Sequence, residues 1–112
     1  MEWLDGVFEV QKDLQSKIQG KTDLEDVVMM YNSATGALVE IGEMLQYDTR
    51  WKAYTTKSKK EPVVDKTAFA EEWCDTFIYM LNTLIYGGYD LNYIKCMAEN
   101  KINKNKMRFN VK

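Results

Sequence analysis

Residues 68–86, AFAEEWCDTFIYMLNTLIY, decide the fold. Apolar side chains recur there every three or four residues, which predicts an amphipathic α-helix. Residues 65–67 offer N-caps at its start, and the pair Gly87-Gly88 ends it. We expect its main apolar stripe, including Trp73, to pack in the core. The stripe consists of Phe69, Trp73, Phe77, Met80, Leu81 and Leu84.

The same periodicity predicts three further helices and no convincing strand. The first spans about residues 5–19 and stops at Gly20. The second runs over about residues 24–54, with Thr22 or Asp23 as its N-cap. A last helix runs from the cap Asp90 to about residue 103. The apolar stripe of the second helix is Leu24, Val27, Val28, Tyr31, Ala34, Leu38, Ile41 and Leu45.

These four helices predict one all-α domain over residues 1–112, folded as an antiparallel four-helix bundle. The chain length is that of a single domain with a modest core, which oligomerisation would help to bury. A polar loop over residues 55–66 contains the only proline, Pro62.

Composition excludes several kinds of chemistry. The 112 residues include no histidine, so a Ser-His-Asp triad, a Cys-His pair and a His-ligated zinc site are all excluded. A general base must then be a carboxylate, a lysine, a tyrosine or a metal-bound water. Cys74 and Cys96 are too far apart in sequence for a typical metal cluster, and we expect buried, reduced thiols.

The N-terminus is acidic where a signal peptide would be basic, and no stretch approaches the ~20 apolar residues of a membrane span. We therefore expect a soluble, cytoplasmic protein without a membrane partner.

The net charge of −2 conceals an asymmetry. Residues 95–112 hold six basic side chains and one acid, so the rest of the chain is acidic. We expect a basic tail, flexible from about residue 104. It has three interpretations: a nucleic-acid contact, a phosphate contact beside a metal site, or a solvated end. The isoelectric point of about 5.2 and the single tail aromatic, Phe109, disfavour nucleic acid.

Four carboxylates carry the functional signal. Glu40 and Glu43 lie three residues apart on one predicted helix, and Glu72 and Asp75 lie three apart on the next. Antiparallel packing of these helices would bring all four together, where repulsion would raise their pKa values. A hard divalent cation with oxygen ligands removes that problem, which predicts a Mg²⁺ site, with Mn²⁺ as the alternative ion. One such pair is common on solvated helices, whereas two in succession are rare.

Each acidic pair belongs to a half-polar strip, which suggests a second buried face on both helices. Gly36 in the interior of the second helix costs about 1 kcal/mol relative to Ala. Close approach of another helix or a ligand would explain why a glycine is tolerated there, and a neutral packing accident is the ordinary alternative. Two helices that each have a second face to bury exceed what a single four-helix bundle requires, which predicts a homodimer or homotetramer. The strips are Asn32, Gly36, Glu40, Glu43 and Tyr47, and Glu72, Asp75, Tyr79, Asn82 and Tyr86.

The paired acidic motif resembles the signature of the all-α nucleoside triphosphate pyrophosphatases, which include MazG-like enzymes and dimeric dUTPases. Residues 50–54 resemble a W-K-x-W segment of the dUTPase branch, and residues 11–15 resemble its Q-x-x-L-N element, with Gln15 where Asn is usual. Asn82 lies where this superfamily often has an asparagine, and the ending Lys101-x-x-x-Asn105-x-x-Arg108 resembles the ending of its small members. The chain departs from the branch by its shortness and by lacking a histidine near the second acidic pair.

The resemblance implies that Glu40, Glu43, Glu72 and Asp75 hold Mg²⁺, and that Glu43 activates the attacking water. The substrate would be a nucleoside triphosphate, with dUTP a candidate, and the products a monophosphate and pyrophosphate. Trp51 would stack on the base and Gln11 would read its edge, although packing and a solvated amide are the ordinary alternatives. The alternative function is a non-catalytic helical module that binds a nucleotide or a protein. The implied substrate-binding set is Gln11, Trp51, Lys52, Asn82, Lys101, Asn105 and Arg108.

Overall fold

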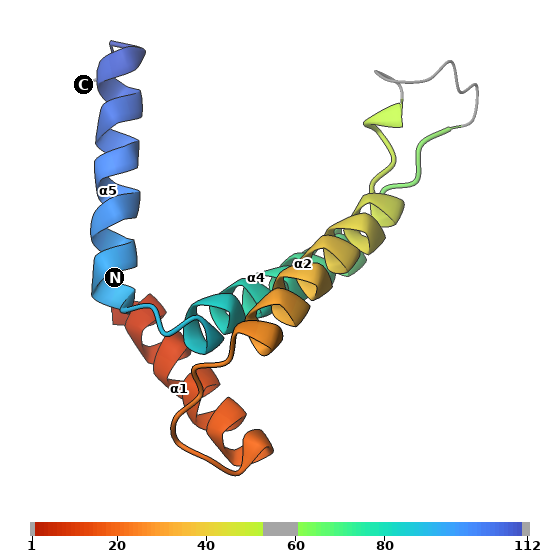
Figure 1. The fold of residues 1–112 in the computed structure, drawn as a ribbon. Helices are drawn as coiled ribbons and strands as arrows, with labels where there is room; N and C mark the ends of the chain where they lie inside the picture. Colours follow the sequence, from red (N-terminus) through yellow and green to blue (C-terminus); the bar gives the residue numbers. More distant parts are fainter. Residues whose placement is uncertain (1, 53–60, 111–112) are drawn as a thin grey trace.

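The computed structural model describes residues 2–52 and 61–110, and this part of the chain is all-α (Figure 1). An isolated β-bridge joins Asp48 and Val64, and the described ranges contain no strand. The expected all-α class with four helices is therefore confirmed. The helices are α1 (Glu2–Gln19), α2 (Val27–Tyr47), α4 (Lys66–Tyr86) and α5 (Leu91–Arg108).

Aspartate side chains begin three of the helices. Asp26, Asp65 and Asp90 each accept hydrogen bonds from backbone N–H groups in the first turn of α2, α4 and α5. Gly20 and Gly88 adopt φ values of +69° and +71° just after α1 and α4, so both expected stops are confirmed.

Several helix boundaries differ from the expectation. α2 begins at Val27 because Asp26, rather than Thr22 or Asp23, is its cap. It ends at Tyr47 instead of about residue 54, because the Tyr47 carbonyl accepts from the Asp65 N–H and the following segment pairs with residues 63–65. α5 continues to Arg108, past its expected end at residue 103. Residues 53 and 54 of the expected helix and residues 55–60 of the expected loop lie outside the described residues.

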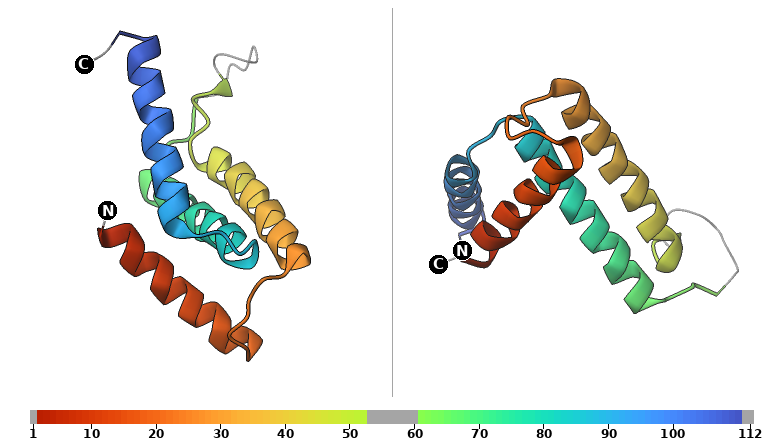
Figure 2. Two further views of the ribbon diagram at one scale, coloured as in Figure 1. Left: turned by 60° about the vertical axis from the view of Figure 1, so that its left-hand side comes forward. Right: turned by 90° about the horizontal axis from the view of Figure 1, so that it is seen from below.

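α2 and α4 pack against each other as a long antiparallel pair, and α1 crosses the C-terminal half of α4 (Figures 1 and 2). The core lies where these elements and the start of α5 meet. α5 is tied to α1 by an ion pair of 2.7 Å between Lys95 Nζ and Asp5 Oδ1, and beyond it diverges from the α2–α4 pair. The buried core comprises Phe8, Leu24, Leu81, Ile85, Tyr86 and Leu91.

The faces of α2 and α4 that we expected to be buried are in part exposed. Trp73 is 54% exposed, stacked on Phe77, and Leu38 of α2 is 70% exposed. The expectation of a core position for Trp73 is therefore wrong. On α2, the small residues Ser33 and Ala37 face into the protein, and large apolar residues are left outside. The exposed large side chains of the expected α2 stripe are Val27, Val28, Tyr31, Leu38 and Ile41.

Cys74 and Cys96 are free, but both are exposed, so the expected burial of the two thiols is wrong. Cys74 lies beside Trp73 on an open side of α4, and Cys96 lies on the diverging α5. Among the described residues, none of the helices is long and apolar enough to cross a membrane.

Candidate metal centre and nucleotide cleft

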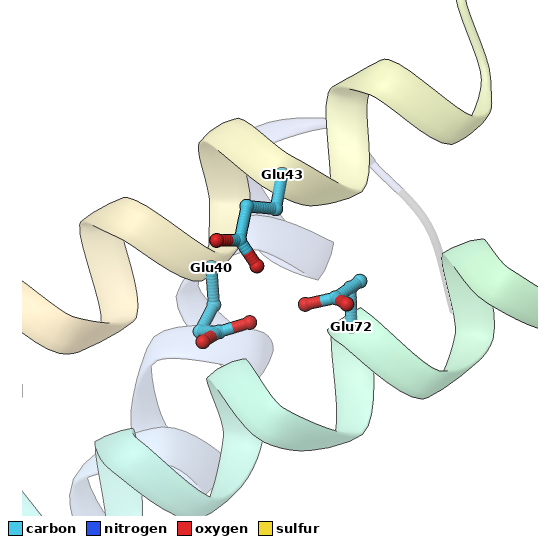
Figure 3. A group of neighbouring side chains, drawn as sticks. All are labelled: Glu40, Glu43 and Glu72. Carbon is cyan, nitrogen blue, oxygen red and sulfur yellow. The ribbon is translucent and has the colours of Figure 1, made fainter.

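Three carboxylates converge between α2 and α4. Glu40 and Glu43, one turn apart on α2, point toward Glu72 on α4 (Figure 3). One carboxylate oxygen from each lies within 4.8 Å of the others. The i, i+3 spacing on α2 and the antiparallel pairing with α4 thus produce the convergence that the acidic motif predicted.

Two buried carboxylate oxygens of the cluster have no hydrogen-bond donor among the described residues. The Oε2 atoms of Glu40 and Glu72 are buried, and no described residue donates a hydrogen bond to either. A carboxylate oxygen removed from water without a donor is strongly unfavourable. The carboxyl of Glu40 is the main cause that raises the pKa of Glu72, burial adds to it, and the charge of Asp75 acts in the same direction.

A divalent cation would relieve this repulsion. The atoms that could coordinate a metal ion are all carboxylate oxygens, the ligand type that Mg²⁺ and other hard cations prefer. Glu43 is exposed while Glu40 and Glu72 are half-buried, so an ion held here would keep an open side toward solvent and a substrate. The buried oxygens without hydrogen bonds and the three carboxylate ligands therefore fit a divalent metal site.

Asp75 lies one turn after Glu72 on α4 but outside the group of three. It lines, together with Glu40, a cleft of about 550 Å³ between α1, α2 and α4. The structure thus places the fourth expected carboxylate at the junction of the acidic cluster and this cleft. The cleft is lined by Gln11, Leu14, Gln15, Glu40, Asp75, Ile78, Tyr79 and Asn82.

Amide side chains form the other end of the cleft. Gln11 Nε2 donates a 2.9 Å hydrogen bond to Asn82 Oδ1, so two residues expected to bind substrate lie together. Asn82 is itself buried. Next to this pair, the hydroxyl of the fully buried Tyr86 donates to Gln15 Oε1. These contacts orient three amides along one wall.

Two residues of the cleft were not identified as site residues from the sequence. Gln15 entered only as a departure from a family element, and Tyr79 only as a member of a half-polar strip. The signal that would have found both is helical spacing, since each lies one turn from an expected site residue: Gln15 from Gln11, and Tyr79 from Asp75.

The other expected substrate contacts are not brought to this cleft. Trp51 and Lys52 follow the end of α2: Trp51 Nε1 donates to the Leu45 carbonyl at 3.1 Å, and Lys52 Nζ lies 5.6 Å from the Trp51 ring centroid. Lys101, Asn105 and Arg108 lie on α5, where every residue from Cys96 to Arg108 is exposed.

The fold is all-α, and its cluster of carboxylates shares Glu40 with an amide-lined cleft. The family model described as dUTPase matches residues 3–111, so the chain belongs to the dUTPase family and is a dUTP diphosphatase-like hydrolase. The comparisons with curated proteins and with solved structures found no significant match.

Proposed function

We propose that the protein hydrolyses dUTP to dUMP and pyrophosphate, with Mg²⁺ as its cofactor. The observation that carries this proposal is the continuity of the two halves of the site. Glu40 belongs both to the acidic cluster and to the cleft that holds the Gln11–Asn82 pair. One extended nucleotide can therefore place its triphosphate at the carboxylates and its base at the amides.

The hydrogen bonds among the amides support a pyrimidine base. Gln11 Nε2 and Asn82 Oδ1 are engaged with each other, which leaves the Asn82 amide hydrogens as donors and Gln11 Oε1 as an acceptor. Gln15 Oε1 accepts from Tyr86, which leaves the Gln15 amide as a second donor. Two donors and one acceptor complement the two acceptors and one donor on the edge of uracil, whereas guanine presents more donors than acceptors. Family membership favours uracil over cytosine.

Each carboxylate has a distinct part in the proposed reaction. Mg²⁺, when bound, supplies charge neutralisation and orientation of the triphosphate. Glu40, Glu72 and Asp75 would hold it, together with Glu43. The exposed carboxylate of Glu43 also accepts the proton of the attacking water. The water oxygen bonds to the α-phosphorus, the bond from that phosphorus to the bridging oxygen breaks, and pyrophosphate leaves with that oxygen.

A second copy of the chain is part of the proposal, as a homodimer or homotetramer. The exposed apolar residues of α2 and α4 meet at a hollow that also includes Ile94 of α5. Exposed apolar patches of this kind mark interfaces. The lysines and Arg108 on the diverging α5 would then contact the phosphates in a neighbouring copy. The shared hollow is lined by Met30, Tyr31, Ala34, Met80, Thr83, Leu84, Tyr89 and Ile94.

We further propose a cytoplasmic setting, because both cysteines are free and exposed, a state that a reducing compartment maintains.

The test is a nucleotide panel. The protein is incubated with Mg²⁺ and dUTP, dCTP, dTTP, UTP or dATP, and monophosphate and pyrophosphate are measured. We expect dUTP to be the best substrate and EDTA to abolish turnover. Preference for dCTP would correct the base assignment. No turnover of any nucleotide, with no Mg²⁺-dependent rise in melting temperature, would favour the alternative of a non-catalytic binding module.

A further inference from the structure

Gly36 of α2 faces the ring of Tyr79 on α4 at unusually short range. A Cβ built on Gly36 would lie 2.6 Å from Tyr79 Cε1 and 2.8 Å from both Cδ1 and Cζ. Such distances are shorter than real side chains tolerate, so any residue other than glycine would have to displace the ring. The other two helical glycines, Gly6 and Gly42, have nothing within 4 Å of the same built atom. Among the glycines within helices, only Gly36 is therefore explained by a close approach.

The displaced ring would enter the cleft. Tyr79 lines it together with Glu40 and Asn82, and it lies on α4 between Asp75 and Asn82. The ring thus stands between the acidic end and the amide end. While it rests against the backbone of α2, the space between the two ends stays open. A ring pushed away from α2 by a methyl group would move into this space, because Tyr79 already lines the cleft.

We propose that Gly36 is a positioning residue for the nucleotide: the missing Cβ lets Tyr79 lie against α2 and keeps open the part of the cleft that receives the sugar. This inference rests on the proposed function, because it concerns the same cleft. It also accounts for a residue that is unfavourable in a helix interior. Gly36 acts through Tyr79 and has no part in the chemical step.

The test compares four variants: Gly36→Ala, Tyr79→Leu, the double variant, and Gly42→Ala as the matched control on the same helix. Two quantities are measured for each, the Kd for the non-hydrolysable analogue α,β-imido-dUTP with Mg²⁺, and the KM and kcat for dUTP. We expect Gly36→Ala to raise Kd and KM by about ten- to a hundredfold, with kcat at saturation close to wild type. The Mg²⁺-induced rise in melting temperature should persist, and Gly42→Ala should bind as the wild type does.

The double variant separates positioning from simple packing. With the Tyr79 ring removed, a Cβ at position 36 has nothing to displace, so the double variant should bind the analogue as Tyr79→Leu does. Comparing the double variant with Tyr79→Leu also tests the inference if Gly36→Ala alone is too unstable to measure. Unchanged binding in Gly36→Ala, a lowered melting temperature with unchanged KM, or a further loss of binding in the double variant would each overturn the inference. A wild-type protein that binds no nucleotide would overturn the proposed function and the inference together.

Discussion

Gln11 Nε2 donates to Asn82 Oδ1 at 2.9 Å and so ties α1 to α4 across 71 residues of sequence. The bond has two consequences. It holds α1 over the α2–α4 pair on the side where the cleft lies, and it fixes which atoms of the two amides remain for a ligand. The site is therefore assembled from both halves of the chain, and α1 completes it.

Removing the amide of Gln11 should weaken nucleotide binding. In Gln11→Ala the Asn82 oxygen loses its donor, and under the proposed function a bound base would lose an acceptor, each worth about 0.5–1.5 kcal/mol. We expect the KM for dUTP to rise about tenfold, because two such bonds change together. Steady-state kinetics measure the effect. Gln19→Ala, an exposed position on the same helix, is the control, and an equal loss there would show that the change disturbs α1 in general.

Glu43→Gln should lose turnover while keeping the fold. The substitution preserves the size of the side chain but removes the proton acceptor, and general-base catalysis contributes about 10²–10⁴-fold. We expect kcat to fall by at least about a hundredfold. Glu71→Gln is the control, because Glu71 is exposed on α4 and does not line the cleft. Full activity in Glu43→Gln would remove Glu43 from its proposed role.

The acidic cluster makes stability depend on pH in the metal-free protein. The pKa of Glu72 is raised above its ordinary 4.5, mainly by Glu40, so the folded state holds this proton more tightly than the unfolded state. The resulting stabilisation is present below about pH 4.5 and is lost as pH rises through the raised pKa. In EDTA at pH 7, Glu72→Gln should therefore melt at a higher temperature than the wild type, with the difference shrinking toward pH 4.5.

Magnesium should reverse that order. The ion neutralises the cluster and binds the folded state, so Mg²⁺ should raise the melting temperature of the wild type and have much less effect on Glu72→Gln. Thermal scans with EDTA and with Mg²⁺ at pH 7 measure both. A wild type that melts at the same temperature in the two buffers contradicts a metal at this position.

The sequence predicts most of this architecture for identifiable reasons. Gly20, Asp65, Gly88 and Asp90 are strong local signals, and the structure uses each of them as expected. The convergence of Glu40, Glu43 and Glu72 follows from helical spacing and antiparallel pairing, both of which are local or topological properties. Local capping signals and helical periodicity are sufficient to predict these features.

The inward face of α2 was not predictable in the same way. Hydrophobicity favours Leu38 and its neighbours as the buried face, yet the helix turns Ser33 and Ala37 inward and sets Gly36 against Tyr79. Small residues permit close helix approach, a steric effect that a hydrophobic pattern does not record. The large apolar side chains of its stripe therefore stay exposed in the single chain. The expected core position of Trp73 is wrong as well, since Trp73 is 54% exposed and its ring stacks on Phe77.

A charge on the exposed apolar face should break the proposed oligomer. Leu38 is 70% exposed in the single chain, so Leu38→Glu costs little unless a second copy covers it. We expect the variant to sediment as a monomer at concentrations where the wild type does not, with lowered activity. Gln46→Glu adds the same charge to an exposed polar position of α2 and is the control. A wild type that sediments as a monomer contradicts the assembly.

The basic residues of α5 provide a test of whether copies share their sites. Arg108→Ala and Lys101→Ala should raise the KM for dUTP and weaken its dependence on salt, because each removes a charge that would bind phosphate. If these residues serve a neighbouring copy, two inactive or weakened proteins should complement each other. Mixing Glu43→Gln with Arg108→Ala under conditions that exchange subunits then pairs an intact acidic centre with an intact α5 in some of the mixed assemblies. We expect the mixture to exceed the summed activity of the two variants measured separately. Simple additivity would instead mean that each α5 serves the acidic centre of its own chain, which would require α5 to fold back from the diverging position that it occupies beyond Lys95.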